Sequence, residues 1–573
     1  MTNPRNADNT TVVFDGIDEV NEKVIAEKFN NYFVDSITEI HNGIAAVNGE
    51  RFIPEQLHNE CLASFSAVTV DDLAEIVKDL KSSSGIRDVS TRVFRDGLKV
   101  TMPILLEIIN ESLVTGIVPS SWKESTVVPI PKVNGTKEGN LHRPINMLKL
   151  QEKVLEVIVK KQLMEFIDNH DILIAEQSGF RKSHSTETAI NQILREWKLN
   201  IEDGCYTVAV FLDLKRAFET IDRVQLVEVL FRLGIRGTAL EWFRNYLLNR
   251  TQVTRYGKEF SSQRDCNLGV PQGSVLGPLL FILYINDMKR CLLQGILKLF
   301  ADDSAVYWSG RNLEDVISQA QADLARLSEY LKSKKLCLNV LKTKFMIIGN
   351  KRVDLNVTLE MNGEQIERVN CTKYLGVQVD EKLNFIEHVD YVIKKVARKY
   401  GVLCRINKSL TFSSKLAYVK SVIMPHLDYC STVLIFASDT QLRRLQRLQN
   451  KIMRVVLRCS RYTPSSLMLD MLQWLSVKQR IIYNCLVFLH KMKTGKLPAY
   501  LEQGVQYNND VHRHNTRGAA DFRLPRYLKT TTQRSLYYRG FKFFNSLPQE
   551  AKDTTNLAEF KRLSIDFVRA HFN

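Results

Sequence analysis

The chain has 573 residues, too many for one ordinary domain, and its content of 45% hydrophobic and 25% charged residues is that of a globular protein. A formal net charge of +16 indicates that the chain binds a polyanionic partner, and nucleic acid is the usual one. Ten cysteines are present, and because no two lie within four residues of each other, CxxC zinc sites are excluded and free thiols are expected.

The N-terminal part, residues 1 to about 110, predicts mostly helix. Apolar side chains recur there near helical spacing, as in Val24, Ile25, Phe29, Tyr32 and Phe33. The longest apolar run of the chain, Val275 to Ile285, is interrupted by Gly277 and Pro278. It is shorter than the roughly 20 residues of a membrane span, so we expect a buried core segment and no membrane partner.

A mixed region of strands and helices follows. Apolar runs at Thr126–Ile130, Tyr206–Leu212 and Ile296–Ala301 predict strands, and an amphipathic stripe over 313–333 predicts a long helix between later strands. From about residue 378 the chain reads as nearly all helix.

Positive charge is concentrated in this helical part. Between Tyr391 and Arg461 there are fifteen Lys or Arg but only two acids, Asp428 and Asp439. Five of the cations step at helical spacing and predict one basic stripe on a helix, namely Arg443, Arg447, Lys451, Arg454 and Arg458. A solvated helix face is the alternative, but such faces usually mix signs, so we expect contact with a nucleic-acid backbone.

Two segments bring carboxylates to strand ends. The run Val208–Leu212 reads as a buried strand that ends at Asp213. Taken alone, such an Asp is usually a helix N-cap. Further along, Leu297–Tyr307 reads as strand, tight turn and strand, with Asp302 and Asp303 at the turn.

Adjacent carboxylates repel each other unless a cation lies between them. Together with Asp213, the pair Asp302 and Asp303 suggests a site for Mg²⁺, which binds carboxylate oxygens and substrate phosphates. Between the two segments lies Gly269-Val270-Pro271-Gln272-Gly273, a forced turn in which glycine permits close approach of a ligand.

The ordered set of motifs resembles the reverse transcriptase of non-LTR (LINE-type) retrotransposons, especially the jockey-like group. The central matches are Asp213-x-x-x-Ala217-Phe218, the segment from Gly269 to Pro278, and Phe300-Ala301-Asp302-Asp303. Further matches, in the family's order, are Val128–Lys132, Arg143-Pro144-Ile145, Gln177–Arg181, Lys342-Thr343, Lys373–Val377, Leu445–Asn450 and Phe544–Pro548. The similarity covers nearly the whole chain.

The resemblance implies a role for each matched residue. Two Mg²⁺ ions, with Mn²⁺ as an alternative, would be held by Asp213, Asp302, Asp303 and the backbone carbonyl of Leu214. The incoming nucleotide would be met by Lys132, Arg143, Gln272 and Phe218, the last as a steric gate under the sugar 2′ position. Nucleic acid would be contacted by Arg181, Tyr374 and the basic stripe, and Lys342 would stand near the leaving pyrophosphate as a proton donor.

Plainer alternatives and departures accompany these roles. Phe218 could simply pack in the core, and Arg181 and Lys342 could be ordinary surface charges. Glu219 stands where the family more often has Asp, and His142 where Tyr is frequent. Neither departure removes a metal ligand.

The implied architecture is α+β, a right-hand polymerase with fingers, palm and thumb. The expected divisions are an N-terminal extension or linker over 1–110, fingers and palm over 111–377, a basic helical thumb over 378–490 and a small C-terminal domain over 491–573. The implied reaction adds dNMP to a primer 3′-OH on an RNA template, so the partners are template RNA, a DNA primer and dNTPs, in a nuclear setting.

Two rival interpretations remain open. One is a domesticated copy that binds nucleic acid without catalysis, and the other is a group II intron maturase or telomerase, which the Phe300–Asp303 sequence and the C-terminal matches disfavour. Residues 1–110 lack room for the endonuclease domain that usually precedes the polymerase in this family. We therefore expect that this chain does not nick DNA, and that an endonuclease in trans or pre-existing breaks supply the primer.

Overall fold

The computed structural model describes residues 11–44, 59–80, 90–133, 135–349, 357–510 and 518–572. The chain forms two compact units that alternate along the sequence. The first unit comprises Met1–Gln177, Asp213–Leu293 and Leu324–Asn339, and the second comprises Ser178–Leu212, Gln294–Asp323 and Val340–Asn573. None of the helices in the described ranges is both long and apolar enough to cross a membrane.

The first unit combines helices with a small mixed sheet. Its helices are α1 (Glu22–Asn42), α2 (Val70–Asp79), α3 (Thr91–Asp96), α4 (Leu98–Thr115), α5 (Leu150–Asn169), α7 (Arg223–Arg232), α8 (Gly237–Leu247) and α9 (Gly277–Tyr284). Its strands are β1 (Val12–Phe14), β2 (Ile17–Glu19), β3 (Glu124–Pro131), β4 (His142–Met147), β6 (Leu214–Lys215), β7 (Arg250–Tyr256), β8 (Glu259–Phe260), β9 (Arg264–Cys266) and β12 (Cys337–Leu338).

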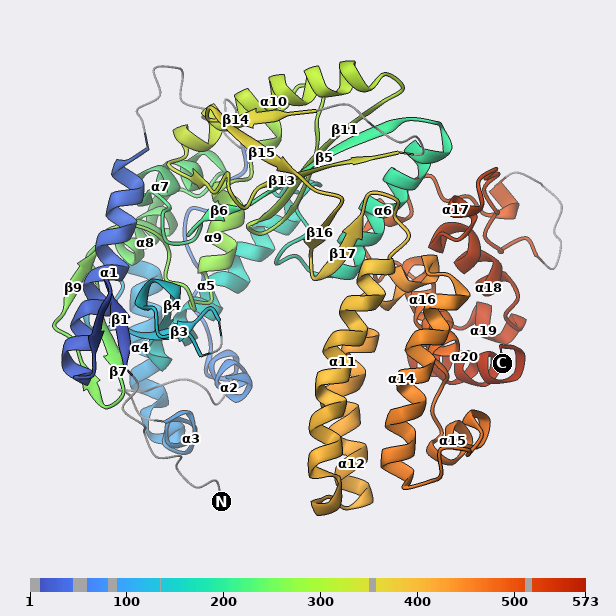
Figure 1. Cartoon of the computed structure of the whole chain (residues 1–573). Coiled ribbons are helices and arrows are strands. Elements are labelled where there is room, and N and C mark those ends of the chain that lie inside the picture. The colour runs from blue at the N-terminus through green and yellow to red at the C-terminus, as the bar shows by residue number, and fades with distance from the viewer. Residues whose placement is uncertain are drawn as a thin grey trace. The chain divides into compact units, whose positions relative to one another are not determined.

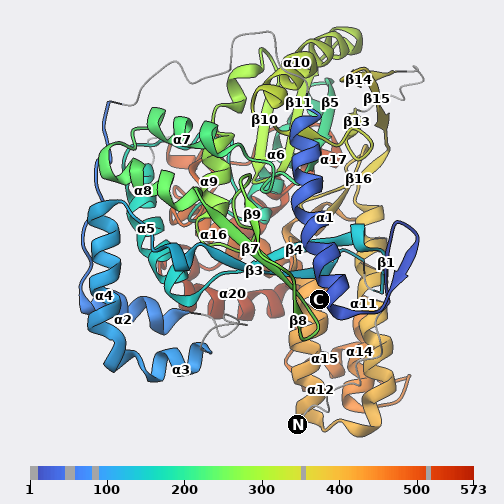
Figure 2. The ribbon, with the colours of Figure 1, turned by 90° about the vertical axis from the view of Figure 1, so that its left-hand side faces the viewer.

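The sheet of the first unit has the order β4-β3-β7-β8, and β9 also pairs with β7. Strand β3 runs antiparallel to β4 and parallel to β7. Helix α1 packs across β7, β8 and β9 (Figure 2). It buries Ile25, Phe29 and Phe33 in a cluster with Val127, because these apolar residues fall on one side of the helix.

The second unit contains a six-stranded sheet of order β10-β11-β5-β13-β15-β14, in which only β13 and β15 are parallel. The strands of this unit are β5 (Tyr206–Leu212), β10 (Ile296–Phe300), β11 (Asp303–Gly310), β13 (Lys344–Ile348), β14 (Leu359–Met361), β15 (Glu364–Arg368), β16 (Cys371–Tyr374) and β17 (Val377–Asp380). Helix α6 (Thr186–Glu202) packs on this sheet, with Trp197 edge-on to Phe211 and Tyr307.

The C-terminal part of the second unit is helical, as its sequence predicts. Its helices are α11 (Ile386–Ile406), α12 (Phe412–Tyr418), α13 (Met424–Asp428), α14 (Asp439–Leu457), α15 (Ser465–Leu472), α16 (Val477–Lys493), α17 (Thr530–Gln533), α18 (Phe541–Asn545), α19 (Gln549–Asp553) and α20 (Leu557–His571). Helices α11 and α14 pack side by side (Figure 1). Helix α14 starts with a capping box in which Ser438 and Gln441 satisfy each other's backbone amides.

Most expected elements are confirmed. Strand β5 has the predicted bounds, β10 ends one residue before the predicted end, and the helix expected at 313–333 is α10 (Leu313–Ser333). The mostly helical N-terminal region also contains the hairpin β1–β2, which the sequence did not predict. None of the ten cysteines is in a disulfide.

Candidate active site

The turn that carries Asp302 and Asp303 connects two antiparallel strands of the second unit. Phe300 pairs with Asp303, so only Ala301 and Asp302 lie outside the ladder. Ala301 adopts a left-handed φ of 58°, which a residue with a Cβ rarely does and which costs about 1 kcal/mol or more. Both carboxylates of the turn are exposed.

Strand β5 ends beside this turn. Strands β5 and β11 lie side by side (Figure 1). In their antiparallel pairing, Leu212 lies opposite Ser304, the residue that follows Asp303. Asp213 is the next residue of the chain after Leu212. The register therefore agrees with the expectation that strand ends carry these acids.

Asn339 orients Asp213 within the first unit. Its Nδ2 donates to Asp213 Oδ2 at 2.9 Å, and its backbone N–H donates to the Asp213 carbonyl at 2.7 Å. The contact continues into the short antiparallel pair β6–β12, where Leu214 lies opposite Leu338. Asn339 could not be recognised from the sequence, because a single amide three residues before the Lys342-Thr343 motif has no distinctive pattern.

Lys342 is exposed and lies two residues before β13. Because β13 pairs antiparallel with β5, with Lys344 opposite Phe211, Lys342 lies at the edge of the sheet where β5 ends. In the second unit, register thus brings Lys342 and the Asp302-Asp303 turn to one edge of the sheet.

The glycine-rich loop of the first unit needs glycine at two positions. Gly269 and Gly273 have φ values of 70° and 123°. A Cβ at Gly269 would collide with the Glu219 carbonyl, and one at Gly273 would lie 2.5 Å from the Asn146 carbonyl oxygen. The sequence predicted such a close turn, and these contacts explain it.

The loop is held to its surroundings by backbone hydrogen bonds. Val270 N donates to Phe218 O at 2.9 Å, and Asn146 N donates to Gln272 O at 2.8 Å. The buried Glu156 of α5 supports the loop, because it accepts a hydrogen bond from Val275 N at 2.8 Å and another from the Tyr246 hydroxyl. Burial, reinforced by Glu152, raises the pKa of Glu156 to about 7.

Glu152 has its own cationic partner. Arg250 Nη2 lies 2.7 Å from Glu152 Oε1, and both side chains are almost fully buried. Burial raises the pKa of Glu152, although Arg250 opposes this shift. The floor of the loop is therefore a connected buried network of two acids, one arginine and one tyrosine.

Three predicted nucleotide-binding residues gather around Glu219. Lys132 follows β3, and Arg143 lies opposite Ile130 on the neighbouring strand β4. The Gln272 side-chain amide, oriented to donate, lies 3.2 Å from Glu219 Oε1 and 2.9 Å from Pro144 O. Burial raises the pKa of Glu219, and the positive charges of Arg216, Lys132 and Arg143 oppose this effect.

Phe218 lies on the same segment and is only partly buried. Its ring stacks on Phe281 of α9, with centroids 4.6 Å apart and planes 28° apart. The packing fixes the direction of the ring while leaving part of it exposed.

The matched segment Lys373–Val377 lies in the antiparallel hairpin β16–β17. Tyr374 was expected to contact nucleic acid, and this expectation is corrected for its side chain. The side chain is only 4% exposed and packs near Phe211, so it supports the hairpin from inside. The turn itself is anchored by Tyr429, whose hydroxyl donates to Leu375 O at 2.8 Å. Residues Leu375 and Gly376 at the turn, rather than the Tyr374 ring, form the tip of the hairpin.

Arg181 is partly exposed in the second unit. It follows Gly179 and Phe180 in a segment that is joined to β10 where Ser178 N donates to Leu299 O at 2.8 Å. Arg181 is therefore carried by a segment tethered to the strand that leads into Asp302.

The basic stripe is largely confirmed. Arg443, Arg447 and Lys451 are exposed on α14, and Arg454 is partly exposed. The opposite face buries Leu442, Leu445, Leu448 and Ile452. One detail is corrected, because Arg458 is the C-cap, in a left-handed conformation just after the end of the helix.

No group of three or more His, Cys, Asp or Glu side chains is gathered into a preformed metal site in the part of the chain that the structure describes. From the sequence, Ser82–Gly85 is expected to be a loop, and His512 and His514 are interpreted as structural or surface histidines; these residues lie outside that part.

Comparison with known proteins gives a class to this site. Residues 130–379 match the family model described as reverse transcriptase (RNA-dependent DNA polymerase). This range contains the glycine-rich loop and every candidate carboxylate of the site. Residues 130–379 are thus a reverse transcriptase domain.

The more particular kinship is to non-LTR mobile elements. The chain is 28% identical over 60% of its length to the probable RNA-directed DNA polymerase from transposon X-element of Drosophila melanogaster, covering 38% of that protein. It is 26% identical over 69% of its length to the probable RNA-directed DNA polymerase from transposon BS, and 27% identical over 68% to the RNA-directed DNA polymerase from mobile element jockey, both of Drosophila melanogaster. In these comparisons the matched segments span 45% and 44% of the relatives. The chain thus covers less than half the length of these curated relatives.

Proposed function

We propose that this chain is an RNA-directed DNA polymerase of a non-LTR mobile element. The observation that carries the proposal is the strand register of the second unit, in which the end of β5 lies opposite the residue after Asp303. Asp213 continues from that strand end, and Asn339 directs its carboxylate. Two strand-borne carboxylate positions of this kind fit a nucleotidyl transfer better than they fit helix capping.

The donor chemistry of these residues fits two Mg²⁺ ions, with Mn²⁺ as the alternative. Asp213, Asp302 and Asp303 offer carboxylate oxygens, and Leu214 offers a carbonyl oxygen on the adjacent residue. Hard divalent cations prefer such ligands together with substrate phosphates. Once bound, the ions would promote ionisation of the primer 3′-OH and offset charge on the departing pyrophosphate.

The remaining residues would bind and orient the substrates. Lys132 and Arg143 supply positive charge for the triphosphate of the incoming dNTP, near the acid Glu219 that they already influence. The primer 3′-oxygen forms a bond to the α-phosphorus, and the bond from that phosphorus to the bridging oxygen breaks. Lys342, which is exposed, would give a proton to the pyrophosphate that leaves.

Specificity would come from residues fixed by packing. Phe218, held by Phe281, would crowd a ribose 2′-OH and so favour dNTPs. Gln272 would lie against the nascent base pair, on a loop whose backbone is tied to Phe218 and Asn146. Both residues belong to the first unit, where β3, β4 and α5 would form part of the fingers.

The right-hand arrangement is part of the proposal. The six-stranded sheet would be the core of the palm, and the basic helices α11 and α14 would be the thumb that follows the template-primer duplex. DNA cleavage by an endonuclease, or a pre-existing break, would supply the DNA 3′ end that serves as primer.

Primer extension tests the proposal directly. Purified protein is mixed with a labelled DNA primer annealed to an RNA template, the four dNTPs and Mg²⁺. We expect extended products that disappear when Mg²⁺ is chelated and return with Mg²⁺ or Mn²⁺. A folded protein that binds the template-primer but adds no nucleotide with either metal would overturn the proposal in favour of a binding protein without catalysis.

A further inference from the structure

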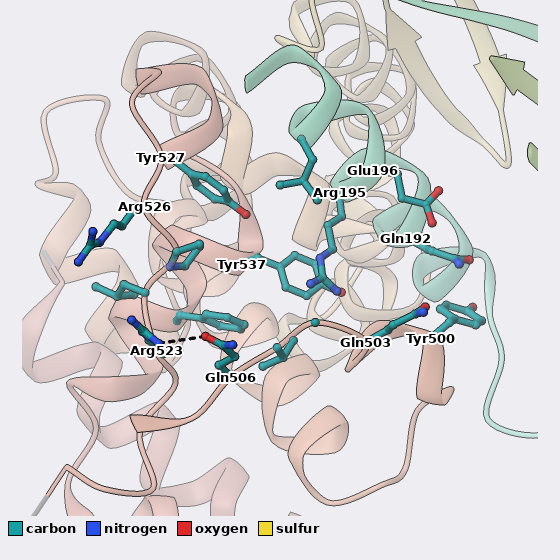
Figure 3. A pocket seen from close by; sticks show the side chains of 16 residues that line it. Gln192, Arg195, Glu196, Tyr500, Gln503, Gln506, Arg523, Arg526, Tyr527 and Tyr537 are labelled. Carbon is teal, nitrogen blue, oxygen red and sulfur yellow. Dashed lines mark hydrogen bonds between the residues drawn. The ribbon is translucent and has the colours of Figure 1, made fainter. Parts of the chain in front are cut away.

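A second candidate ligand site lies in the second unit, away from the residues assigned to polymerisation. It is a cavity of about 580 Å³ between α6 and the C-terminal residues 500–506 and 523–541, shown in Figure 3. This volume is within the range of small-ligand sites. None of the residues that line it is a candidate for metal or dNTP binding.

One wall of the cavity presents a stacked cation and ring. The guanidinium of Arg195, on α6, lies 4.2 Å from the centroid of the Tyr537 ring. Arg195 Nη1 also donates to Leu501 O at 3.1 Å, which fixes the side chain in this position. Figure 3 shows Tyr527 reaching into the same cavity from the C-terminal segment. Flat aromatic and guanidinium surfaces of this kind stack on nucleobases.

Cations and amides complete the lining. Arg523 and Arg526 lie on the C-terminal segment, and Gln192, Gln503 and Gln506 offer side-chain amides. The acid in the lining, Glu196, is already neutralised, because Lys298 Nζ lies 3.0 Å from its Oε1 and Tyr307 donates to it. The cavity is therefore positively charged and rich in groups that can hydrogen-bond to base edges.

The wall that carries Arg523 is held in place before any ligand arrives. Arg523 N donates to Gln506 O at 2.8 Å, and its Nη1 donates to Gln506 Oε1 at 3.2 Å. The neighbouring Phe522 is clamped at both backbone groups by Asn545, with distances of 3.0 and 2.7 Å. Asn545 belongs to the motif Phe544–Pro548, to which the proposed polymerase reaction assigns no role.

We propose that this cavity binds an unpaired nucleotide of a single-stranded nucleic acid. The base would stack on Tyr527, the glutamines would meet its edge, and Arg523 with Arg526 would meet the backbone phosphates. A base inside a duplex cannot enter such a cavity, because both of its faces are already stacked. The site would hold a strand outside the polymerase centre, so it adds to the proposed function without depending on it.

The test compares single strands with duplexes. Binding of a fluorescein-labelled RNA single strand, the same sequence as DNA, and the RNA in a perfect duplex is measured by anisotropy with the full chain. The double variant Arg523→Gln/Arg526→Gln and the single variant Tyr527→Ala should each weaken single-strand binding about tenfold and leave duplex binding nearly unchanged. The RNA and DNA arms show which single strand the site prefers.

Matched variants separate a specific site from a general loss of charge or fold. Arg562→Gln, at an exposed position of α20, removes a charge elsewhere in the C-terminal region and should leave binding unchanged. Tyr527→Phe keeps the ring and should keep affinity, while melting temperatures report any loss of folding. Equal weakening of single strands and duplexes, or no weakening in Tyr527→Ala, would overturn the proposal.

The outcome is distinguishable from a failure of the polymerase proposal. Extension of a preformed template-primer at saturating concentration should be close to wild type in the cavity variants, because no residue of the polymerase site is changed. A wild-type protein that extends no primer would refute the proposed function and leave the binding comparison intact.

Discussion

The carboxylate of Asp213 has a fixed direction because Asn339 donates to it from the side chain and to its carbonyl from the backbone. A hydrogen bond to a charged group contributes about 1.5–3 kcal/mol. We predict that Asn339→Ala lowers kcat for nucleotide addition by about tenfold or more, while the Kd for template-primer stays nearly unchanged. Equal losses in kcat and in binding would instead indicate a general loss of folding around β6 and β12.

Phe218 packs against Phe281 and is also the residue proposed to select dNTPs over rNTPs. Its stacking on Phe281 holds a partly exposed ring five residues after Asp213. We predict that Phe218→Val lowers the ratio of kcat/KM for dNTP over rNTP by about tenfold or more, since the smaller side chain leaves room for a 2′-OH.

The control for this variant is stability. Trimming a partly buried ring should cost about 1–2 kcal/mol, so a modest fall in melting temperature is expected beside the change in selectivity. A stability loss with an unchanged ratio would return Phe218 to core packing.

Glu156 gives the fold a pH dependence of known sign. Its pKa is raised to about 7 in the folded protein from an ordinary value near 4.5. The folded state therefore binds the Glu156 proton more tightly than the unfolded state does. Protonated Glu156 stabilises the fold fully below about pH 4.5, and this contribution is lost as the pH rises through 7. We predict that the free energy of unfolding falls more steeply between pH 5 and about 8 in the wild type than in Glu156→Gln.

Urea unfolding at a series of pH values measures this difference, and comparison with the variant removes the contribution of other acids. Parallel stability curves for the two proteins would show that Glu156 does not titrate in this range. A parallel pH series of primer extension would show whether the loop that Glu156 supports responds as well.

At the scale of elements, α14 separates an apolar face from a basic face. Its apolar side packs inside the second unit, and Arg443, Arg447 and Lys451 remain exposed. If these residues contact phosphates, each contact releases counterions on binding. We predict that changing all three to Gln lowers the slope of log K against log salt for duplex binding by roughly one unit or less per residue, and weakens all sequences alike.

The control changes Lys561 and Arg562 of α20 to Gln, which removes charge from another exposed helix of the same unit. It should leave the slope unchanged. An unaltered slope in the α14 triple variant would mean that the stripe is merely solvated.

Element boundaries followed from the sequence where one periodicity dominates. The mainly apolar run Tyr206–Leu212 predicted β5 correctly, and the amphipathic stripe predicted α10. Strands β1 and β2 were missed, because three residues are too few to show alternation. Arg458 continued the helical spacing in sequence, yet its left-handed φ ends α14 one residue earlier.

At the scale of the whole molecule, the chain passes from one unit to the other several times, and no local sequence pattern predicts such a division. Motif residues could be predicted because they stand at strand ends and tight turns. Their supports could not: Asn339, Glu156 and Asn545 are single polar residues whose partners lie far away in sequence. Tyr374 shows the opposite failure, since a motif position does not reveal whether its side chain is buried.

The four consecutive ranges expected for extension, fingers with palm, thumb and C-terminal domain remain a prediction. The family model matches residues 130–379, whereas the expected fingers and palm span 111–377.

The measurement that tests the central claim most directly is primer extension by Asp302→Asn beside Asp315→Asn. Both variants remove one exposed carboxylate from the second unit, but Asp315 lies in the first turn of α10 and is assigned no role. Loss of a metal ligand should cost several kcal/mol in the transition state. We predict that Asp302→Asn lowers extension at least about a hundredfold with template-primer binding retained, and that Asp315→Asn extends like the wild type. Near wild-type extension by Asp302→Asn would contradict the assignment of the polymerase site.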